Sequence, residues 1–214
     1  MINQIKTDFD KIVKTSSFST DDIKLKRQYL NKFIENGFPN RKLENWKFSD
    51  ISQIIQRNIG ELSFYNDYSS SNKIDTSIFI DGLEHNKIFF INGRVEKIDF
   101  SYEDQGQIEI IEDPKSDNIL DNNNSLIDLN KAFTNKSYRI LIKKNYFFKK
   151  PLIVYHTTNH KIKSKNINLS LEFKLEQNSS LRLIDFFNDD NDKNFINIFY
   201  NFDLKKDAIL KNYK

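Results

Sequence analysis

The chain has 214 residues, of which 38% are hydrophobic, and 33 basic against 30 acidic side chains give it a formal net charge of +3. This length suits one large domain or two small ones, and the apolar fraction lies below the globular norm of about 45–50%, so a core of moderate size is expected. Because the basic residues are spread along the chain rather than gathered into a stripe, nucleic acid is not an expected partner.

Cysteine is absent from the sequence. These residues therefore provide no disulfide, no thiolate nucleophile and no thiolate ligand for an iron–sulfur cluster. Lysine and aspartate interrupt the apolar residues at the N-terminus, and no run approaches the roughly 18 apolar residues that a membrane span needs. We therefore expect no membrane partner, and the absence of a recognisable secretion signal predicts a cytoplasmic protein.

Two amphipathic helices are predicted at the N-terminus. Apolar residues at helical spacing, beginning with Ile5 and Phe9, predict a helix near residues 2–14. A second helix is expected after Ser19, whose hydroxyl can accept from free amides while Asp22 reaches back in a capping box. We interpret both as packing helices rather than as membrane-surface or partner-binding elements.

The stretch GFPNRKLENWKFSD, residues 37–50, contains the only tryptophan. Gly37 suits the left-handed position just past a helix, where Phe38 can fold back on the helix and Pro39 prevents its continuation. Trp46 and Phe48 alternate with polar residues, which predicts an extended segment with both rings on one face.

Trp46 is interpreted as a core anchor, because a single tryptophan beside a phenylalanine is more often structural than ligand-binding. Its replacement by alanine would then lower the free energy of unfolding by about 3–5 kcal/mol. Ser49 is expected to cap a third helix, in which Ile51, Ile54 and Ile55 face inward.

This stretch resembles the N-terminal signature of the SufD family of iron–sulfur cluster assembly proteins, Gly-Leu-Pro-Thr-Arg-x-x-Glu-x-Trp-Lys-Tyr-Thr-Asp. The positions that fit directly are Gly37, Pro39, Arg41, Glu44, Trp46, Lys47 and Asp50, and the mild departures are Phe38, Asn40, Phe48 and Ser49. The resemblance implies a non-enzymatic scaffold subunit that pairs through its β-helix with the paralogous SufB, carries the ATPase SufC, and helps to assemble and deliver clusters.

After a polar link at residues 60–76 the pattern becomes strand-like, in SIFIDG (77–82), in residues 86–100 and in QIEII (107–111). Asn92-Gly93 predicts a tight turn between two antiparallel strands, since both residues tolerate positive φ. A helix is predicted at about 125–133, capped by Asn124 or Ser125. Its LNKAF segment is similar to the Leu-Asn-x-Ala-Phe element of the SufD family.

From Tyr138 onward almost only strands are expected, and two stretches repeat. FKLEQNSSLR (173–182) aligns with FDLKKDAILK (202–211) at an offset of 29 residues, which suits one coil of a β-solenoid with two strands per coil. The SufD family resemblance independently implies a right-handed parallel β-helix.

The expected fold is therefore α+β to mainly β, with an N-terminal helical region followed by a parallel β-helix. Three segments are predicted: 1–60 helical, 61–135 mixed and 136–214 the start of the β-helix. Because the sequence stops within a strand pattern at Lys214 without a capping element, we expect a truncated chain. It would correspond to the N-terminal half of the family's length, without the C-terminal region that contacts SufC.

No catalytic, cofactor-binding or metal-binding residue is assigned. His156 and His160 are close in sequence, but on a strand they would lie about 13 Å apart, so they and His85 are interpreted as solvated residues at strand ends or in loops. The run Asp189 to Asp192 lacks the glycine and the distal glutamate of an EF-hand and is interpreted as a loop. Any cluster would be handled by the complex rather than by this segment.

Two alternative functions remain open. A parallel solenoid is also a common platform for enzymes that act on polysaccharides, although these usually carry a secretion signal. The chain could also belong to the SufB branch, which its signature and its lack of cysteine disfavour.

Overall fold

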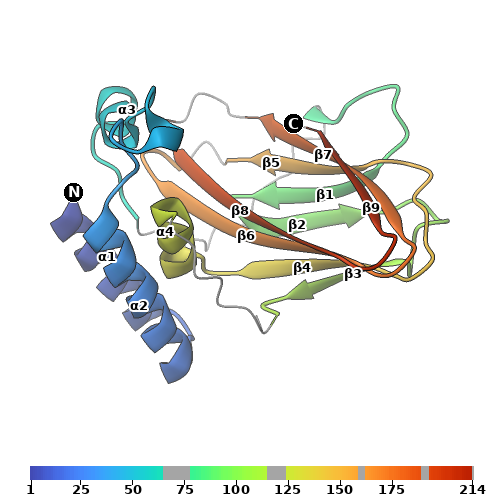
Figure 1. Ribbon diagram of the computed structural model, residues 1–214, viewed down its shortest axis with the longest axis horizontal. Helices are drawn as coiled ribbons and strands as arrows, with labels where there is room; N and C mark the ends of the chain where they lie inside the picture. Colours follow the sequence, from blue (N-terminus) through green and yellow to red (C-terminus); the bar gives the residue numbers. More distant parts are fainter. Residues whose placement is uncertain (65–77, 115–123, 159–161, 189–192, 214) are drawn as a thin grey trace.

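The computed structural model describes residues 1–64, 78–114, 124–158, 162–188 and 193–213, which form mixed α and β structure with an N-terminal helical part. The helices gather at one end of two β-sheets (Figure 1). They are α1 (Ile2–Thr15), α2 (Thr20–Asn36), the short 3₁₀ helix η1 (Glu44–Trp46), α3 (Ile51–Asn58) and α4 (Ser125–Phe133). Within the described ranges, no helix has both the length and the apolar character needed to cross a membrane.

The predicted beginnings of the helices are largely confirmed. Helix α2 starts with a capping box, in which the Ser19 hydroxyl accepts from the Asp22 amide and the Asp22 carboxylate accepts from the Ser19 amide. Asn124 caps α4, accepting from the amide of Leu126. For α3 the predicted cap is wrong by one residue, because the Asp50 carboxylate rather than Ser49 accepts from the Gln53 amide.

The end of α2 follows the prediction. Gly37 has φ of +69°, its amide donates to the Phe33 carbonyl, and the ring of Phe38 packs edge-on to that of Phe33 with the centroids 5.0 Å apart. A positive φ strains any residue with a Cβ, which explains the glycine at this position.

The next part of the stretch corrects two predictions. Residues Glu44–Trp46 form a 3₁₀ turn rather than an extended segment, so Trp46 and Phe48 do not share one face. Trp46 is only half-buried and Phe48 is 85% exposed. Because the cost of truncating an aromatic side chain depends on the buried volume it leaves empty, the expected loss of 3–5 kcal/mol for Trp46→Ala is too large.

In helix α3, only two of the three isoleucines predicted to face inward do so. Ile55 is buried and Ile51 packs against the helical core, but Ile54 is 44% exposed.

The strands of the middle segment are only partly as predicted. Asn92 and Gly93, with φ of 52° and 78°, form the expected turn between the antiparallel strands β1 (Asn86–Ile91) and β2 (Arg94–Asp99). QIEII falls on β3 (Ile108–Glu112). The described residues 78–82 of SIFIDG form no strand, because Ile78, Phe79 and Ile80 instead cover the outer face of the neighbouring sheet.

The remaining strands confirm the prediction that the chain from about Tyr138 onward forms almost only strands. They are β4 (Ser137–Ile142), β5 (Leu152–Thr157), β6 (Asn166–Leu175), β7 (Ser180–Asn188), β8 (Phe195–Leu204) and β9 (Ile209–Tyr213). One sheet has the order β2-β1-β5-β7-β9 and the other β3-β4-β6-β8, so consecutive strands from β4 to β9 alternate between the sheets.

Each strand from β4 to β7 pairs in parallel with the strand two further along the chain. Phe173 faces Phe202 and Leu175 faces Leu204 in the β6–β8 pair, while Leu181 faces Leu210 in the β7–β9 pair. These partners are 29 residues apart, so the repeat in the sequence is confirmed as the strand register. Asn178 and Asp207, which the repeat also aligns, both have positive φ, at 55° and 58°.

Three apolar clusters hold these elements together. The largest fills the space between the two sheets, with Ile88, Phe90, Ile140, Val154, Leu171, Phe173 and Leu183 among its buried members. A second joins α1, α2, α3 and α4, and a third lies on the outer face around Phe89 and Tyr155. The predicted division at residues 60/61 and 135/136 stays a prediction.

Helix α4 gives the LNKAF segment a structural role. Leu129, Asn130, Ala132 and Phe133 are all buried. The Asn130 amide nitrogen donates to the carbonyls of Leu169 on β6 and Asn197 on β8, at 3.0 and 2.7 Å. Asn130 thus ties the helix to two strands of one sheet.

Candidate functional site

A cleft of about 810 Å³ lies between α2, the end of α4 and the sheet that contains β4, β6 and β8. Its wall includes Lys26 and Tyr29 from α2, Lys131 and Thr134 from the end of α4, and Phe199 from β8. A concave site of this size that holds residues with shifted pKa values is the usual starting point in a search for a ligand site.

Lys26 is the most perturbed residue of the cleft. Burial lowers the pKa of its ammonium group to about 8, although Asp22 and Asp113 oppose the shift. Its Nζ donates to the carbonyl oxygens of Thr134 and Lys131, at 2.5 and 3.4 Å, and lies 4.6 Å from the centroid of the Phe18 ring. Since the last carbonyls of a helix have no partners within it, Lys26 serves as a cap for α4.

Lys131 lies near two aromatic rings. Its Nζ is 5.1 Å from the centroid of Tyr29 and 5.8 Å from that of Phe199, and it donates to the Tyr29 hydroxyl at 3.5 Å. Burial lowers the pKa of Lys131 and raises that of Tyr29. Both ammonium groups have partners within the protein. Their contacts therefore explain the two lysines as structural residues, and no ligand is assigned to the cleft.

The lowered pKa of Lys26 has a measurable consequence. We expect its acylation by an amine-reactive reagent to rise with pH around a midpoint of about 8, because only the unprotonated amine reacts. At pH 8 the fraction of free amine would exceed that of an ordinary lysine by about 100-fold. Mass spectrometry of competitive labelling between pH 6 and 11, with Nα-acetyl-lysine in the same tube as the reference, measures the midpoint. A midpoint equal to that of the reference amine would contradict the assigned environment.

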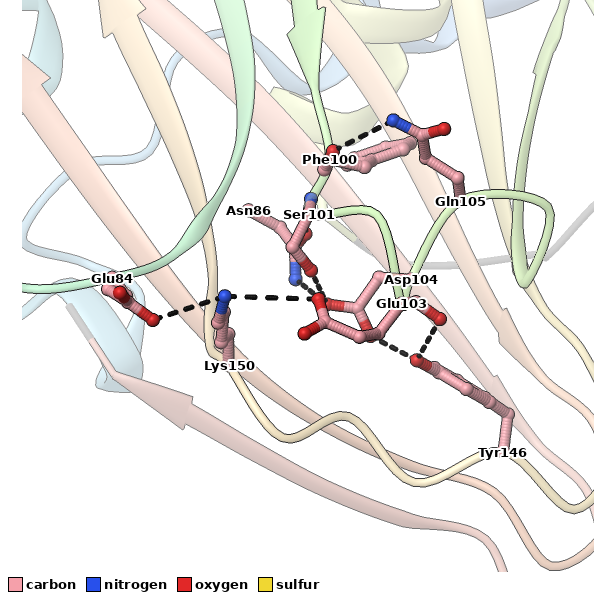
Figure 2. A network of polar contacts seen from close by, with 9 residues as sticks. All are labelled: Glu84, Asn86, Phe100, Ser101, Glu103, Asp104, Gln105, Tyr146 and Lys150. Carbon is pink, nitrogen blue, oxygen red and sulfur yellow. Dashed lines mark hydrogen bonds and ion pairs between the residues drawn. The ribbon is translucent and has the colours of Figure 1, made fainter.

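A second polar cluster surrounds Asp104 (Figure 2). This buried carboxylate accepts from the Asn86 side chain at 2.7 Å, from the Ser101 hydroxyl and from the Tyr146 hydroxyl. Burial, followed by the bond to Asp104, raises the pKa of Tyr146. Because Asn86 is on β1 and Tyr146 precedes β5, the cluster pins the loop between β2 and β3 to the five-stranded sheet.

Lys150 extends this cluster toward solvent, where Figure 2 shows it between Glu84 and Glu103. Its Nζ lies 3.1 Å from the Glu84 carboxylate and 3.9 Å from that of Glu103. Such exposed pairs contribute little to stability, because solvent screens them, so this cluster is best explained as a structural support of the loop.

The structure corrects the interpretation of two histidines as solvated. His85 is 7% and His156 is 5% exposed. The His85 Nε2 atom lies 2.7 Å from the Tyr155 hydroxyl, and burial lowers the pKa of His85. His160 and the run Asp189 to Asp192 lie outside the described residues.

His156 is brought together with residues from two other strands. Its Nε2 atom lies 3.0 Å from the Tyr200 hydroxyl oxygen and 3.5 Å from Oδ1 of Asp185, to which Tyr200 also donates a hydrogen bond. The second oxygen of Asp185, Oδ2, is buried without a hydrogen-bond partner among the described residues. Burial and the charge of Asp185 raise the pKa of Tyr200.

Sequence reasoning missed Asp185 and Tyr200, although a signal was present. In LRLIDFF the inward positions are Leu181, Leu183 and then Asp185, so a carboxylate takes the place of a core side chain. A polar residue at an inward strand position needs a partner, which is a reason to inspect it. The partner could not be identified without knowing that β5, β7 and β8 adjoin.

Among the residues that the structure describes, no three His, Asp or Glu side chains form a group suited to hold a metal ion. The cluster of His156, Asp185 and Tyr200 contains only two side chains of these types, and its third member is a tyrosine. In comparisons with known proteins, no protein-family profile and no curated protein matches the chain.

Proposed function

We propose that the chain is a scaffold subunit of an iron–sulfur cluster assembly complex of the SufD type. In this proposal it is not an enzyme, works in the cytoplasm, and pairs with SufB and with the ATPase SufC. The signature between Gly37 and Asp50 supports the family, and the parallel pairing of alternate strands at a 29-residue register is the observation that supports the architecture.

The strands from β4 to β9 are proposed to be the first coils of a right-handed parallel β-helix. Support comes from their alternation between two sheets and from the 29-residue register of the last two parallel pairs. Parallel crossover connections are right-handed in about 98% of cases, which favours the proposed handedness.

A scaffold that pairs by its strands needs accessible backbone edges. Within the described residues β8 and β9 are the last strands of their sheets, and Phe202, Leu204, Ile209 and Tyr213 on them are 37–54% exposed. Unpaired strand edges with exposed apolar side chains can be covered by further strands, either of the same chain or of a partner.

Affinity purification from the protein's own cells tests the proposal. With a tag placed before Met1, SufB and SufC are expected to co-purify in near-stoichiometric amounts. Failure of the tagged protein to retain SufB would refute the assignment.

A further inference from the structure

We propose that His156, Asp185 and Tyr200 form a binding site for one divalent first-row transition-metal ion, for which zinc is the test ion. The inference rests on the side chains alone and does not depend on the proposed function. It also departs from the sequence-based expectation that this segment binds no metal.

The geometry of the three side chains suits a common ligand. The imidazole Nε2 atom lies 3.0 Å from the Tyr200 oxygen and 3.5 Å from Asp185 Oδ1, and these two oxygens are themselves in hydrogen-bond contact. Zinc binds histidine nitrogen and carboxylate oxygen at about 2.0–2.2 Å, so ligand atoms around one ion lie about 3.0–3.5 Å apart. The two distances from Nε2 match this spacing, whereas the Tyr200 and Asp185 oxygens are closer together and would move apart when an ion replaces the proton between them.

The charge balance at the site also favours a cation. The Asp185 side chain is completely buried, and within the described part of the chain its ion-pair contact is with His156, which is charged only when protonated. A buried carboxylate with one unsatisfied oxygen is costly unless positive charge compensates it. Oδ2 of Asp185 lacks a hydrogen-bond partner in the described structure and is therefore available as a further ligand atom.

The aromatic surroundings of His156 would hold its ring in place. Its ring is stacked between Phe90 and Phe187, with centroids 5.5 and 4.8 Å away. Phe187 is 49% exposed and Tyr200 is half-buried, so the site lies close to solvent and an ion can reach it. A low-polarity shell strengthens electrostatic attraction between an ion and its ligands.

Binding would release one proton. The phenol proton of Tyr200 would leave to solvent as the oxygen becomes a phenolate ligand. The two positive charges of the ion would then be balanced by the Asp185 carboxylate and the phenolate.

Calorimetric titration of the metal-free, tag-free chain with zinc at pH 7.5 tests the proposal. We expect one ion per chain, a dissociation constant of micromolar or tighter, and release of one proton, measured by repeating the titration in two buffers of different ionisation enthalpy. Asp185→Asn and His156→Gln should each weaken binding at least 100-fold, in line with the ~10–100-fold losses caused by changes in the surrounding ligand shell alone. Tyr200→Phe should weaken binding and abolish the proton release.

The His85–Tyr155 pair provides a matched control. It has the same contact between an imidazole and a phenol, at 2.7 Å, but the Tyr155 oxygen has the Ile80 amide as its further described partner instead of a carboxylate. Tyr155→Phe should therefore keep both the affinity and the proton release. A combined variant of His160→Gln with Asp189, Asp190 and Asp192 changed to Asn should also retain the zinc affinity and the proton release. This control tests whether these four residues, which could also ligate zinc, account for the binding.

Absence of zinc binding by the folded chain would overturn the proposal, as would affinity that survives Asp185→Asn or is lost in the combined variant. If the folding of Asp185→Asn is impaired, the decision falls to Tyr200→Phe, for which unchanged proton release would contradict the site. A site that binds zinc without any association with SufB would support this inference while the proposed function fails, so the two outcomes remain distinguishable.

Discussion

Phe173→Ala is expected to lower the free energy of unfolding by about 3–5 kcal/mol, the usual cost of removing a fully buried aromatic side chain. Phe173 has 0% of its surface exposed and stacks against Tyr200 and Phe202, with centroids 6.0 and 5.7 Å away. It lies between the two sheets, where surrounding strands on both sides restrict collapse of the cavity. Urea unfolding followed by circular dichroism measures the change.

Phe202→Ala is the matched control, because Phe202 pairs with Phe173 one repeat further along the chain. Phe202 is 37% exposed on the edge strand β8, so its loss should cost only about 1–2 kcal/mol. Equal losses for the two variants would mean that β8 is covered in solution, for example by self-association. A small loss for Phe173→Ala would contradict the assignment of this residue to the core between the sheets.

Asn130→Asp is expected to destabilise the chain by about 3–5 kcal/mol at pH 7, because it buries an uncompensated charge. The side-chain nitrogen of Asn130 donates to the carbonyls of Leu169 and Asn197, and the residue has no exposed surface. The substitution replaces this donor by an oxygen, which faces two carbonyl oxygens and repels them.

The pH dependence gives this effect a distinctive sign. Burial raises the pKa of the new carboxyl group in the folded state above its unfolded value of about 3.9, so the folded state takes up a proton more readily. The difference in stability from the parent chain should therefore be largest at neutral pH and shrink as the pH falls through the raised pKa.

Asn31→Asp supplies the control for Asn130→Asp. It makes the same chemical change at an exposed position of α2 and should alter the stability by less than about 0.5 kcal/mol. If both variants behave alike, Asn130 does not anchor α4 to the sheet. A pH-independent loss for Asn130→Asp would show that the missing hydrogen bonds, rather than the charge, dominate the effect.

Several features of the fold could be predicted because their causes are local. Ser19 and Asp22 are three residues apart, so one turn of chain suffices to form the capping box that starts α2. Asn92 and Gly93 tolerate positive φ whatever surrounds them, and together they determine the turn between β1 and β2. The 29-residue repeat predicted the pairing of Phe173 with Phe202 because equivalent residues of consecutive repeats adjoin in a parallel register.

The environment of an individual side chain was less predictable. Trp46 follows a pattern that fits an extended core anchor, yet its backbone turns and the ring remains half-exposed. The alternation around Phe79 fits a strand, but its ring packs on Phe89 and Tyr155 as part of a cover for the sheet. Periodicity identifies apolar residues but does not say which surface they will cover.

What the sequence by itself determined is therefore the starts of α2 and α4, the turn at Asn92 and Gly93 and the repeat register, all of which follow from short-range hydrogen bonding and periodicity. Only the tertiary structure decided that His156 meets Tyr200, 44 residues away, and that Asp185, on the strand β7 that pairs with β5, contacts both. It likewise decided that Lys26 meets the end of α4, more than 100 residues further along the chain. The physical reason is that burial, charge and ligand geometry depend on which elements become neighbours, and this is set by packing of the whole chain rather than by any one segment.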